Sequence, residues 1–414
     1  MKYTVCELFA GVGGLRLGLE KSGWKTVFAN QWEPGRKIQY AADCYLTHFP
    51  DETFNPFFNK DINLVTAELE NNSKAIPDHT LLTGGFPCQD YSVATTKAKG
   101  MAGKKGVLWW EIEKIVRHKR PPYVLLENVD RLLVSPATQR GRDMGILLGC
   151  LRDLDYSVEW RVINAADYGF PQKRRRVFIF AFRNDTKIAK KLDTKKMKKE
   201  GSWRNWLQKD GFFASEFRVD VESGDHNVPD DFAHTVQEIS DDFSFKFHNA
   251  GVMSAGKIYT LKVAPIHQEP ATLASVLQRK VDDYYYIPES DIKKAKGWAY
   301  VKGSKREERT AKTGFKYHFT EGAIPFPEKL DIPARTILTG EGNQNPNRST
   351  HLILDPRTKK YRTLTPVEAE RLNGFPDDWT NTGMPLSKRY FCMGNALVVG
   401  LIERMGKHLK VFIK

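Results

Sequence analysis

Short apolar segments alternate with amphipathic ones through the first 183 residues of the chain. Tyr3 to Phe9 is predicted as a strand, Gly13 to Ser22 as a helix, and later strands are expected at His79 to Thr83 and Tyr123 to Leu126. This alternation predicts an α/β fold with an open, mostly parallel sheet and helices on both faces. Because ligands bind such sheets beyond the carboxyl ends of the strands, functional side chains are expected there.

The alternation stops near residue 184. Lysine-rich segments with many aromatic residues follow, until Thr365 and Pro366 open a helix as N-cap and first-turn proline. A last helix is expected from about Asn395 to Leu409. The sequence therefore predicts a regular domain over residues 1–183, a smaller, irregular domain over 184–332 and a C-terminal segment over 333–414.

The chain carries a strong positive charge. Its 414 residues have a formal net charge of +14, and residues 173–199 hold twelve Lys or Arg against two acids. Such an excess favours a polyanionic partner and a groove that follows a phosphate backbone. No run of 18 apolar residues occurs, so we expect a soluble, cytoplasmic protein without a membrane segment.

The five cysteines are scattered without a paired spacing, which argues against both a disulfide framework and a zinc site. Four of them are expected to be buried small hydrophobic residues: Cys6, Cys44, Cys150 and Cys392. Cys88 differs, because Pro87-Cys88-Gln89 follows an apolar strand and the turn formers Gly84-Gly85. A thiol on that loop is placed for nucleophilic attack, provided that its thiolate is stabilised.

A second strand end carries an acid. Glu127 and Asn128 follow the apolar run Tyr123 to Leu126. Two strand ends that present a nucleophile and a carboxyl group on one edge of a sheet predict an active site.

A glycine turn, Phe9-Ala10-Gly11-Val12-Gly13-Gly14, links the first strand to the first helix. Glycines let the backbone approach a ligand whose negative group lies at the helix N-terminus. A dinucleotide fingerprint needs a glycine at position 16, where Arg16 stands, so NAD and FAD are disfavoured. The methionine carboxylate of S-adenosylmethionine is a candidate ligand instead.

The next two strand ends offer further contacts. Glu33 is placed to hold a ribose diol, and Trp32 to lie on an adenine ring or to be a half-buried core aromatic. Asp61, followed by Ile62, is placed either to accept from the adenine amino group or to cap the following helix.

An exposed thiol, a strand-end carboxyl group and an adenosyl site together favour methyl transfer to a carbon that is not nucleophilic by itself. C5 of cytosine is such a carbon. Attack of Cys88 on C6 makes C5 nucleophilic if Glu127 protonates or hydrogen-bonds N3.

These residues resemble the C5-cytosine DNA methyltransferase family over residues 1–183 and 333–408. The match runs in order through Phe9 to Gly14, Gly85-Phe86-Pro87-Cys88-Gln89, Glu127-Asn128-Val129, Asp167-Tyr168-Gly169, Gln172-Lys173-Arg174-Arg175-Arg176, Arg335-Thr336 and Gly394-Asn395-Ala396. The resemblance implies a Rossmann-like, S-adenosylmethionine-dependent fold for residues 1–183. It also implies that residues 184–332 recognise the DNA target and that residues 333–414 return to the catalytic domain.

The resemblance also implies roles for single residues. Arg174 and Arg176 would line the pocket of a cytosine extruded from the duplex, beside Cys88 and Glu127. Residues 93–105 resemble the loop that closes over the extruded base. The implied cofactor contacts are Phe9, Ala10, Gly11, Gly13, Gly14, Leu15, Trp32, Glu33, Asp61, Ile62, Gly85, Pro87, Leu108, Asn395 and Ala396.

One position departs from the family. A glutamate commonly precedes the aromatic residue at the second strand end, whereas Gln31 precedes Trp32 here and Glu33 follows it. Either Glu33 or Gln31 would then hold the ribose. The base that removes the C5 proton is not identified by the sequence, and a water is an alternative.

The leading hypothesis is a sequence-specific DNA (cytosine-5-)-methyltransferase that acts on double-stranded DNA as a monomer, without a metal, and protects DNA from a cognate restriction endonuclease. Seven residues of the variable segment are candidates for phosphate or guanine contacts: Arg204, Lys209, Arg279, Lys302, Lys305, Arg306 and Arg309. The alternatives are a tRNA-methylating relative and a catalytically inactive DNA-binding relative. The presence of both Cys88 and Glu127 disfavours the inactive relative.

Overall fold

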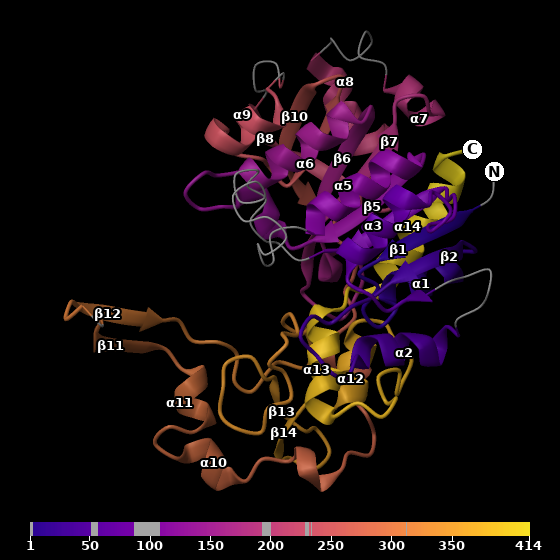
Figure 1. The fold of residues 1–414 in the computed structure, drawn as a ribbon. Coiled ribbons are helices and arrows are strands. Elements are labelled where there is room, and N and C mark those ends of the chain that lie inside the picture. Colours follow the sequence, from indigo (N-terminus) through magenta and orange to yellow (C-terminus); the bar gives the residue numbers. More distant parts are fainter. Residues whose placement is uncertain are drawn as a thin grey trace. The chain divides into compact units, whose positions relative to one another are not determined.

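The computed structural model describes residues 3–50, 57–86, 108–192, 200–227, 232, 234–311 and 313–414 (Figure 1). These residues form two compact units. The first comprises Met1–Tyr168, Arg175–Gln268 and Val399–Lys414, and the second comprises Gly169–Arg174 and Glu269–Val398. The predicted Cys88 and the loop over residues 93–105 lie outside the described residues.

A ten-stranded mixed sheet forms the centre of the first unit, and one half of it is parallel. The strand order in this half is β3 (Phe57–Phe58), β2 (Lys25–Asn30), β1 (Thr4–Leu8), β4 (Leu81–Gly85) and β5 (Tyr123–Asn128). Each neighbouring pair in this half is parallel, so these strands end at one edge. This arrangement confirms the predicted Rossmann-like α/β class.

The sheet continues beyond β5 with antiparallel strands. They follow in the order β7 (Arg175–Arg183), β6 (Tyr156–Asn164), β9 (Ala250–Ser254), β10 (Lys257–Pro265) and β8 (Val219–Asn227). Three of these strands lie after residue 184. The sheet therefore includes strands from the predicted segment 184–332, and the part of this segment that belongs to the second unit begins at Glu269.

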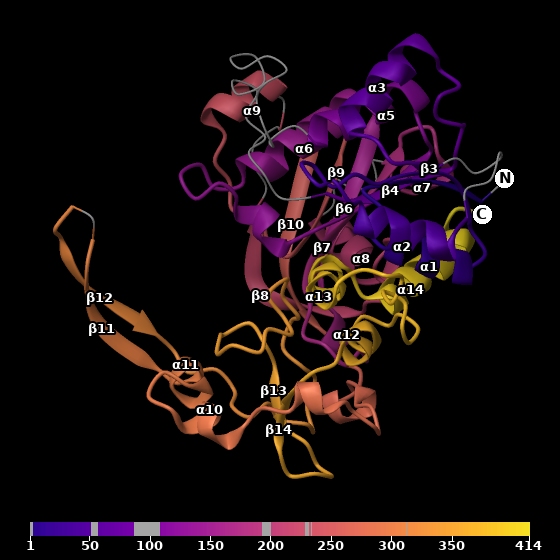
Figure 2. The same cartoon turned by 60° about the horizontal axis from the view of Figure 1, so that its bottom comes forward.

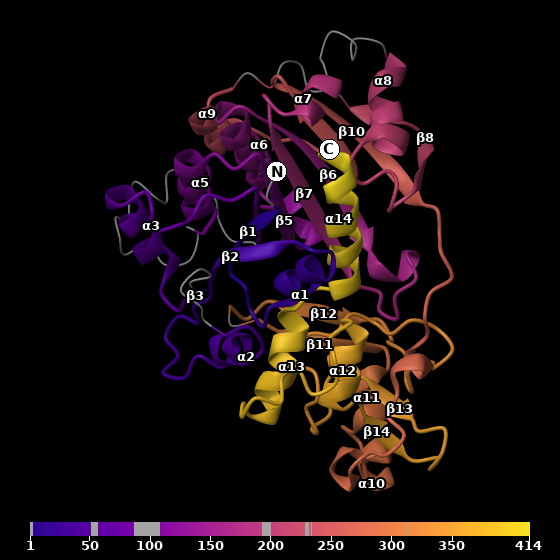
Figure 3. The same ribbon diagram turned by 90° about the vertical axis from the view of Figure 1, so that its right-hand side faces the viewer.

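Helices cover both faces of the sheet (Figure 3). One face carries α1 (Gly14–Lys21) and α14 (Val399–Phe412), and the other carries α3 (Ile62–Asn71), α5 (Leu108–Lys119) and α6 (Arg142–Asp153). The remaining helices of this unit are α2 (Tyr40–His48), α7 (Lys187–Lys191), α8 (Glu200–Asn205) and α9 (Val236–Asp242). The core contains fully buried side chains such as Trp109, Leu147 and Trp160.

Two buried charges on β6 explain why the segment after residue 200 joins the first unit. Glu159 accepts hydrogen bonds from Trp206 Nε1 at 3.0 Å and from the amide of Phe212 at 2.8 Å. Arg161 donates to the carbonyls of Leu207 at 2.6 Å and Phe217 at 3.1 Å. These bonds hold residues 206–217 on the sheet, because buried charges need such partners.

The second unit contains helices α10 (Glu289–Lys293), α11 (Trp298–Lys302), α12 (Pro366–Leu372) and α13 (Leu386–Asn395), and strands β11 (Lys305–Thr310), β12 (Lys316–Glu321), β13 (Leu352–Leu354) and β14 (Tyr361–Thr363). A buried network joins β14 to the end of β13 and to α12: Arg362 pairs with Asp355 at 2.7 Å and with Glu368 at 2.8 Å. Thr365 caps α12 in a capping box, which confirms the predicted start of that helix.

The predicted last helix begins later than expected. Asn395 ends α13, Ala396 is its C-cap, and a new helix starts at Val399. None of the helices in the described residues has the length and apolar character needed to cross a membrane.

Candidate active site and cofactor edge

Glu127 lies near the carboxyl end of β5, where Arg176 of the neighbouring β7 reaches it. Arg176 Nε and Glu127 Oε1 are 2.7 Å apart, and the two side chains are 15% and 12% exposed. The pair follows from the antiparallel register, which places Glu127 opposite Phe178, two residues from Arg176. A charge-assisted bond of this kind fixes the direction of the carboxylate while leaving it a narrow opening to solvent.

Gly85 lies opposite Glu127 in the parallel register of β4 and β5. A Cβ atom at Gly85 would approach Glu127 Oε2 to 3.0 Å, which is tighter than ordinary packing. Glycine at this position therefore leaves the room that the carboxylate occupies.

Asn128 fixes the start of the segment that carries the predicted nucleophile. Its Nδ2 donates to the carbonyl of Phe86 at 2.9 Å, and its Oδ1 accepts from the amide of Val129 at 2.8 Å. Pro87 and Cys88 follow Phe86 directly but lie outside the described residues. Asn128 is part of the motif Glu127-Asn128-Val129. Its bond to the Phe86 carbonyl was not predicted, because only the fold brings Phe86 beside it.

The glycine turn after β1 has the backbone that its sequence predicts. Phe9, Gly11 and Gly13 have positive φ angles of 54°, 56° and 87°. A Cβ at Gly13 would lie 2.5 Å from the Phe49 ring, whereas a Cβ at Gly11 would meet nothing within 4 Å. The turn therefore needs glycine for packing at Gly13 and is open at Gly11.

Gln31 and Glu33 have different partners in the structure. Gln31 Oε1 accepts a hydrogen bond from the amide of Gly11 at 2.8 Å, so it closes the glycine turn from the end of β2. Glu33 Oε2 accepts from the amide of Ala41 in the first turn of α2 at 3.0 Å. Gln31 thus faces the turn, and Glu33 acts as a cap for α2.

Trp32 and Asp61 are the two remaining candidates at the strand ends, and their surroundings differ. Trp32 is 37% exposed, and its contact with an adenine ring stays a prediction. Asp61 is the N-cap of α3 and accepts from the amide of Asn63 at 3.0 Å, which confirms the capping alternative. Ile62 is buried as the first residue of that helix.

A buried polar cluster lies beneath the turn. Glu7 Oε1 accepts from the amide of Arg16 at 3.1 Å, and Tyr45 donates to Glu7 Oε2 at 2.8 Å. Burial raises the pKa of Glu7 to about 7, and the bond from Tyr45 opposes that rise. Arg16 pairs with Glu20, and its guanidinium lies 4.3 Å from the centroid of the Phe49 ring. These contacts do not place Arg16 to bind a ligand. An acid within an apolar strand was the sequence signal for Glu7.

Arg174 has other contacts than those predicted. It belongs to the second unit, is 1% exposed, and donates to the carbonyls of Ile337 at 3.1 Å and Gly394 at 2.8 Å. The guanidinium therefore holds backbone of its own unit. Asn395 and Ala396 also belong to the second unit, and their contribution to the cofactor site stays a prediction.

The residues at the parallel edge fit an adenosyl ligand. The open Gly11 and the helix N-terminus at Gly14 follow β1, the exposed Trp32 follows β2, and Leu15 is buried in the first turn of α1. Leu108 is the first residue of α5 and the first described residue after the gap. Within the described ranges, no three His, Cys, Asp or Glu side chains are grouped to hold a metal ion.

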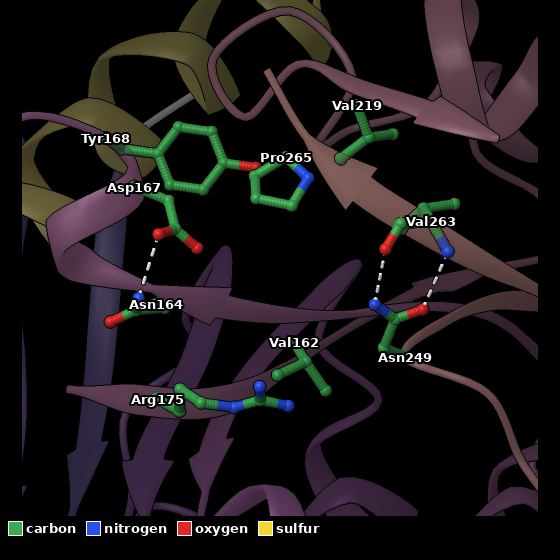
Figure 4. Close-up of a pocket in the computed structure, with 9 residues that line it drawn as sticks. All are labelled: Val162, Asn164, Asp167, Tyr168, Arg175, Val219, Asn249, Val263 and Pro265. Carbon is green, nitrogen blue, oxygen red and sulfur yellow. Dashed lines mark hydrogen bonds between the residues drawn. The ribbon is translucent and has the colours of Figure 1, made fainter. Parts of the chain in front are cut away.

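A small cavity of about 60 Å³ lies elsewhere in the first unit, among β6, β8, β10 and the start of β7 (Figure 4). Asn164 Nδ2 donates to Asp167 Oδ1 at 2.9 Å on its wall. Neither Glu127 nor the glycine turn lines this cavity, so it is separate from the site described above.

The seven basic residues that were predicted to contact phosphate or guanine differ in their burial and ion pairing. Lys302 is buried and donates to the carbonyl of Arg348 at 3.1 Å, and burial lowers its pKa to about 8, so it is not placed for DNA contact. Lys305 and Arg309 pair with glutamates. Arg204, Lys209, Arg279 and Arg306 are exposed.

Comparison with known proteins is consistent with this geometry. The profile of the family C-5 cytosine-specific DNA methylase matches residues 3–411. The chain is 46% identical over 415 residues to the Type II methyltransferase M.Sau3AI of Staphylococcus aureus, across 99% of this chain and 96% of that protein. It is 38% identical over 182 residues to the Type II methyltransferase M.HhaI of Haemophilus parahaemolyticus, across 44% of this chain and 50% of that protein.

A solved structure shows a similar fold. The crystal structure of a DNMT2 mutant of Spodoptera frugiperda matches with a TM-score of 0.58 and 15% identity, over 100% of both chains. With the profile and the relatives, the chain belongs to the C-5 cytosine-specific DNA methylase family.

Proposed function

We propose that this chain is the modification enzyme of a Type II restriction system, which methylates C5 of one cytosine in a short, fixed sequence of double-stranded DNA. The observation that carries this proposal is the Glu127–Arg176 pair opposite Gly85, at the sheet edge from which the chain leads to Cys88. The identity to M.Sau3AI over nearly the whole of both chains supports the restriction context.

In the proposed reaction the target cytosine is extruded from the duplex, because its C5 and C6 are not accessible within the stack. The Cys88 thiolate adds to C6, and Glu127 donates a proton or a hydrogen bond to N3 as negative charge develops there. Arg176 holds the Glu127 carboxyl group in the required direction. After transfer, a base removes the C5 proton, and the C6–sulfur bond breaks to release Cys88.

S-adenosylmethionine, when bound, supplies the methyl group. The backbone of the Phe9 to Gly14 turn would hold its methionine portion, Gln31 would lie beside the ribose, and the Trp32 ring would lie on the adenine. The open Gly11 position and the exposed Trp32 support this assignment.

Replacement of Cys88 by Ala tests the mechanism. We expect Cys88→Ala to abolish transfer of a labelled methyl group to duplex DNA and to leave DNA binding in place. Cys150→Ala is a matched control that should stay active, because Cys150 is buried and burial raises its pKa to about 12. Full activity of Cys88→Ala would overturn the mechanism.

Bisulfite sequencing of DNA from cells that express the chain would identify the methylated sequence. Methylation within one short motif is the expected result. Transfer to tRNA, with none to duplex DNA, would contradict the proposed substrate.

A further inference from the structure

The strands β11 and β12 form a two-stranded ribbon in the second unit. Each strand has six residues, and the register runs from Lys305↔Glu321 to Thr310↔Lys316. Neither strand pairs with any other described strand. The ribbon extends away from α10 and α11 in both Figure 1 and Figure 2.

One face of the ribbon is braced by its own side chains. Successive residues point to opposite faces of a strand, so this face carries Lys305, Glu307, Arg309, Tyr317, Phe319 and Glu321. The Arg309 guanidinium lies 3.6 Å from the centroid of the Phe319 ring. Arg348 Nε lies 3.3 Å from Glu321 Oε1, which ties the base of the ribbon to the rest of the unit.

The opposite face is open. It carries Arg306, Glu308, Thr310, Lys316, His318 and Thr320, and all six are exposed and able to form hydrogen bonds. Lys316 Nζ pairs with Glu308 Oε1 at 3.0 Å. Arg306 forms no ion pair with any carboxylate in the described part of the chain. A face of this composition adds little to the stability of a hairpin, which is marginal with two strands alone.

The width of a two-stranded ribbon and the polar side chains of its open face match one kind of surface. The major groove of B-DNA, about 12 Å wide, admits a two-stranded ribbon, and arginine, threonine and similar side chains read base edges there. The unpaired Arg306 complements the negative groove. Phe315 at the tip is 69% exposed, and Gly314 with φ +84° forms the turn before it.

We propose that the open face of the β11–β12 ribbon enters the major groove of the target duplex and reads part of its sequence. This inference rests on the proposed function. Arg306 donates to a guanine edge, and Thr310, His318 and Thr320 contact neighbouring bases. Phe315 makes an apolar contact with a thymine methyl group or the groove wall.

Pairing with a second copy of the chain through the ribbon edge is less well supported. Charged residues occupy both strands, and charges on an edge strand disfavour association. The open face also lacks the apolar centre that a protein interface needs.

The test uses the full chain and the double variant Arg306→Ala/His318→Ala. Binding is measured to a duplex with the methylated sequence and to one with that sequence scrambled. Loss of base contacts should reduce the ratio of the two affinities by about 10- to 100-fold and change the binding of scrambled DNA little. S-adenosylmethionine binding should not change. Lys293→Ala is the matched control, because Lys293 is an exposed cation of the same unit, outside the ribbon, and should keep the ratio.

A second measurement does not depend on any variant. Single thymines of the target are replaced by 5-iodouracil, whose iodine lies in the major groove, and wild-type complexes are irradiated. Cross-links should map to residues 305–321. Cross-links only to other segments, or an unchanged ratio in the double variant, would overturn the ribbon proposal. A dimer that the double variant abolishes would instead assign the face to a second copy. A wild-type chain that methylates no duplex would contradict the proposed function itself.

Discussion

The side chain of Gln31 connects the end of β2 to the glycine turn through its bond to the Gly11 amide. A glutamate could accept the same bond, whereas an alanine could not. We therefore expect Gln31→Ala to weaken S-adenosylmethionine binding about 2- to 12-fold, the effect of one lost hydrogen bond. Gln31→Glu should bind at least as tightly as the wild type. Isothermal titration with S-adenosylmethionine measures both.

Glu33 provides the comparison at the same strand end. Its carboxylate caps α2 through the Ala41 amide. Glu33→Ala should therefore act mainly on thermal stability and have a smaller effect on the affinity for the ligand. If Glu33→Ala weakens binding strongly and Gln31→Ala does not, the ribose contact belongs to Glu33.

At the scale of elements, the pairing of β4 with β5 places Gly85 opposite Glu127, the carboxyl group that we propose as catalytic. A methyl group at Gly85 would press on Glu127 Oε2. We expect Gly85→Ala to lower kcat by about 10- to 100-fold, in the range of a misplaced acid–base group, with little change in S-adenosylmethionine affinity. Single-turnover methylation at saturating DNA measures it.

A double-mutant cycle identifies the route of this effect. In a Glu127→Ala background the carboxylate is absent, so Gly85→Ala should cause no further loss of rate. An equal additional loss in that background would show that Gly85 acts independently of Glu127.

Glu7, on β1, predicts a pH dependence of stability. Its pKa is raised from 4.5 to about 7, so the folded chain binds more protons at this site than the unfolded chain between these pH values. The stability that Glu7 contributes therefore falls as the pH rises from about 4.5 to 7 and is constant above it.

The neutral variant Glu7→Gln lacks this titration. Relative to the wild type, it should gain on the order of 1–3 kcal/mol of unfolding free energy between pH 5 and pH 8. Urea unfolding at several pH values measures the difference. Glu68→Gln, an exposed carboxylate on α3, should show no such trend, and a flat difference for Glu7→Gln would contradict the prediction.

At the scale of the whole molecule, the sequence predicted what local patterns determine. The glycine turn, the Thr365 cap and the strand that ends at Glu127 each follow from neighbouring residues. The antiparallel half of the sheet was not predicted. Glu159 and Arg161 resemble the solvent-facing residues of an alternating strand, and only distant partners around Trp206 and Phe217 bury them.

The contacts of single residues with backbone were also beyond prediction. Arg174 belongs to a basic motif, and its spacing gives no sign that its guanidinium holds the carbonyls of Ile337 and Gly394. Such bonds join residues more than 160 positions apart, and no periodicity in the sequence records them.

These backbone contacts bear on how far the sequence of the second unit can vary. Gln172 donates to the carbonyl of Leu372 and accepts from the amide of Ile337, while Arg174 binds two more carbonyls. Main-chain groups are present whatever side chains they carry. Bonds of this kind do not depend on the side chains of their partners, so substitutions can accumulate at most positions from Glu269 to Val398 without redesign of residues 169–174.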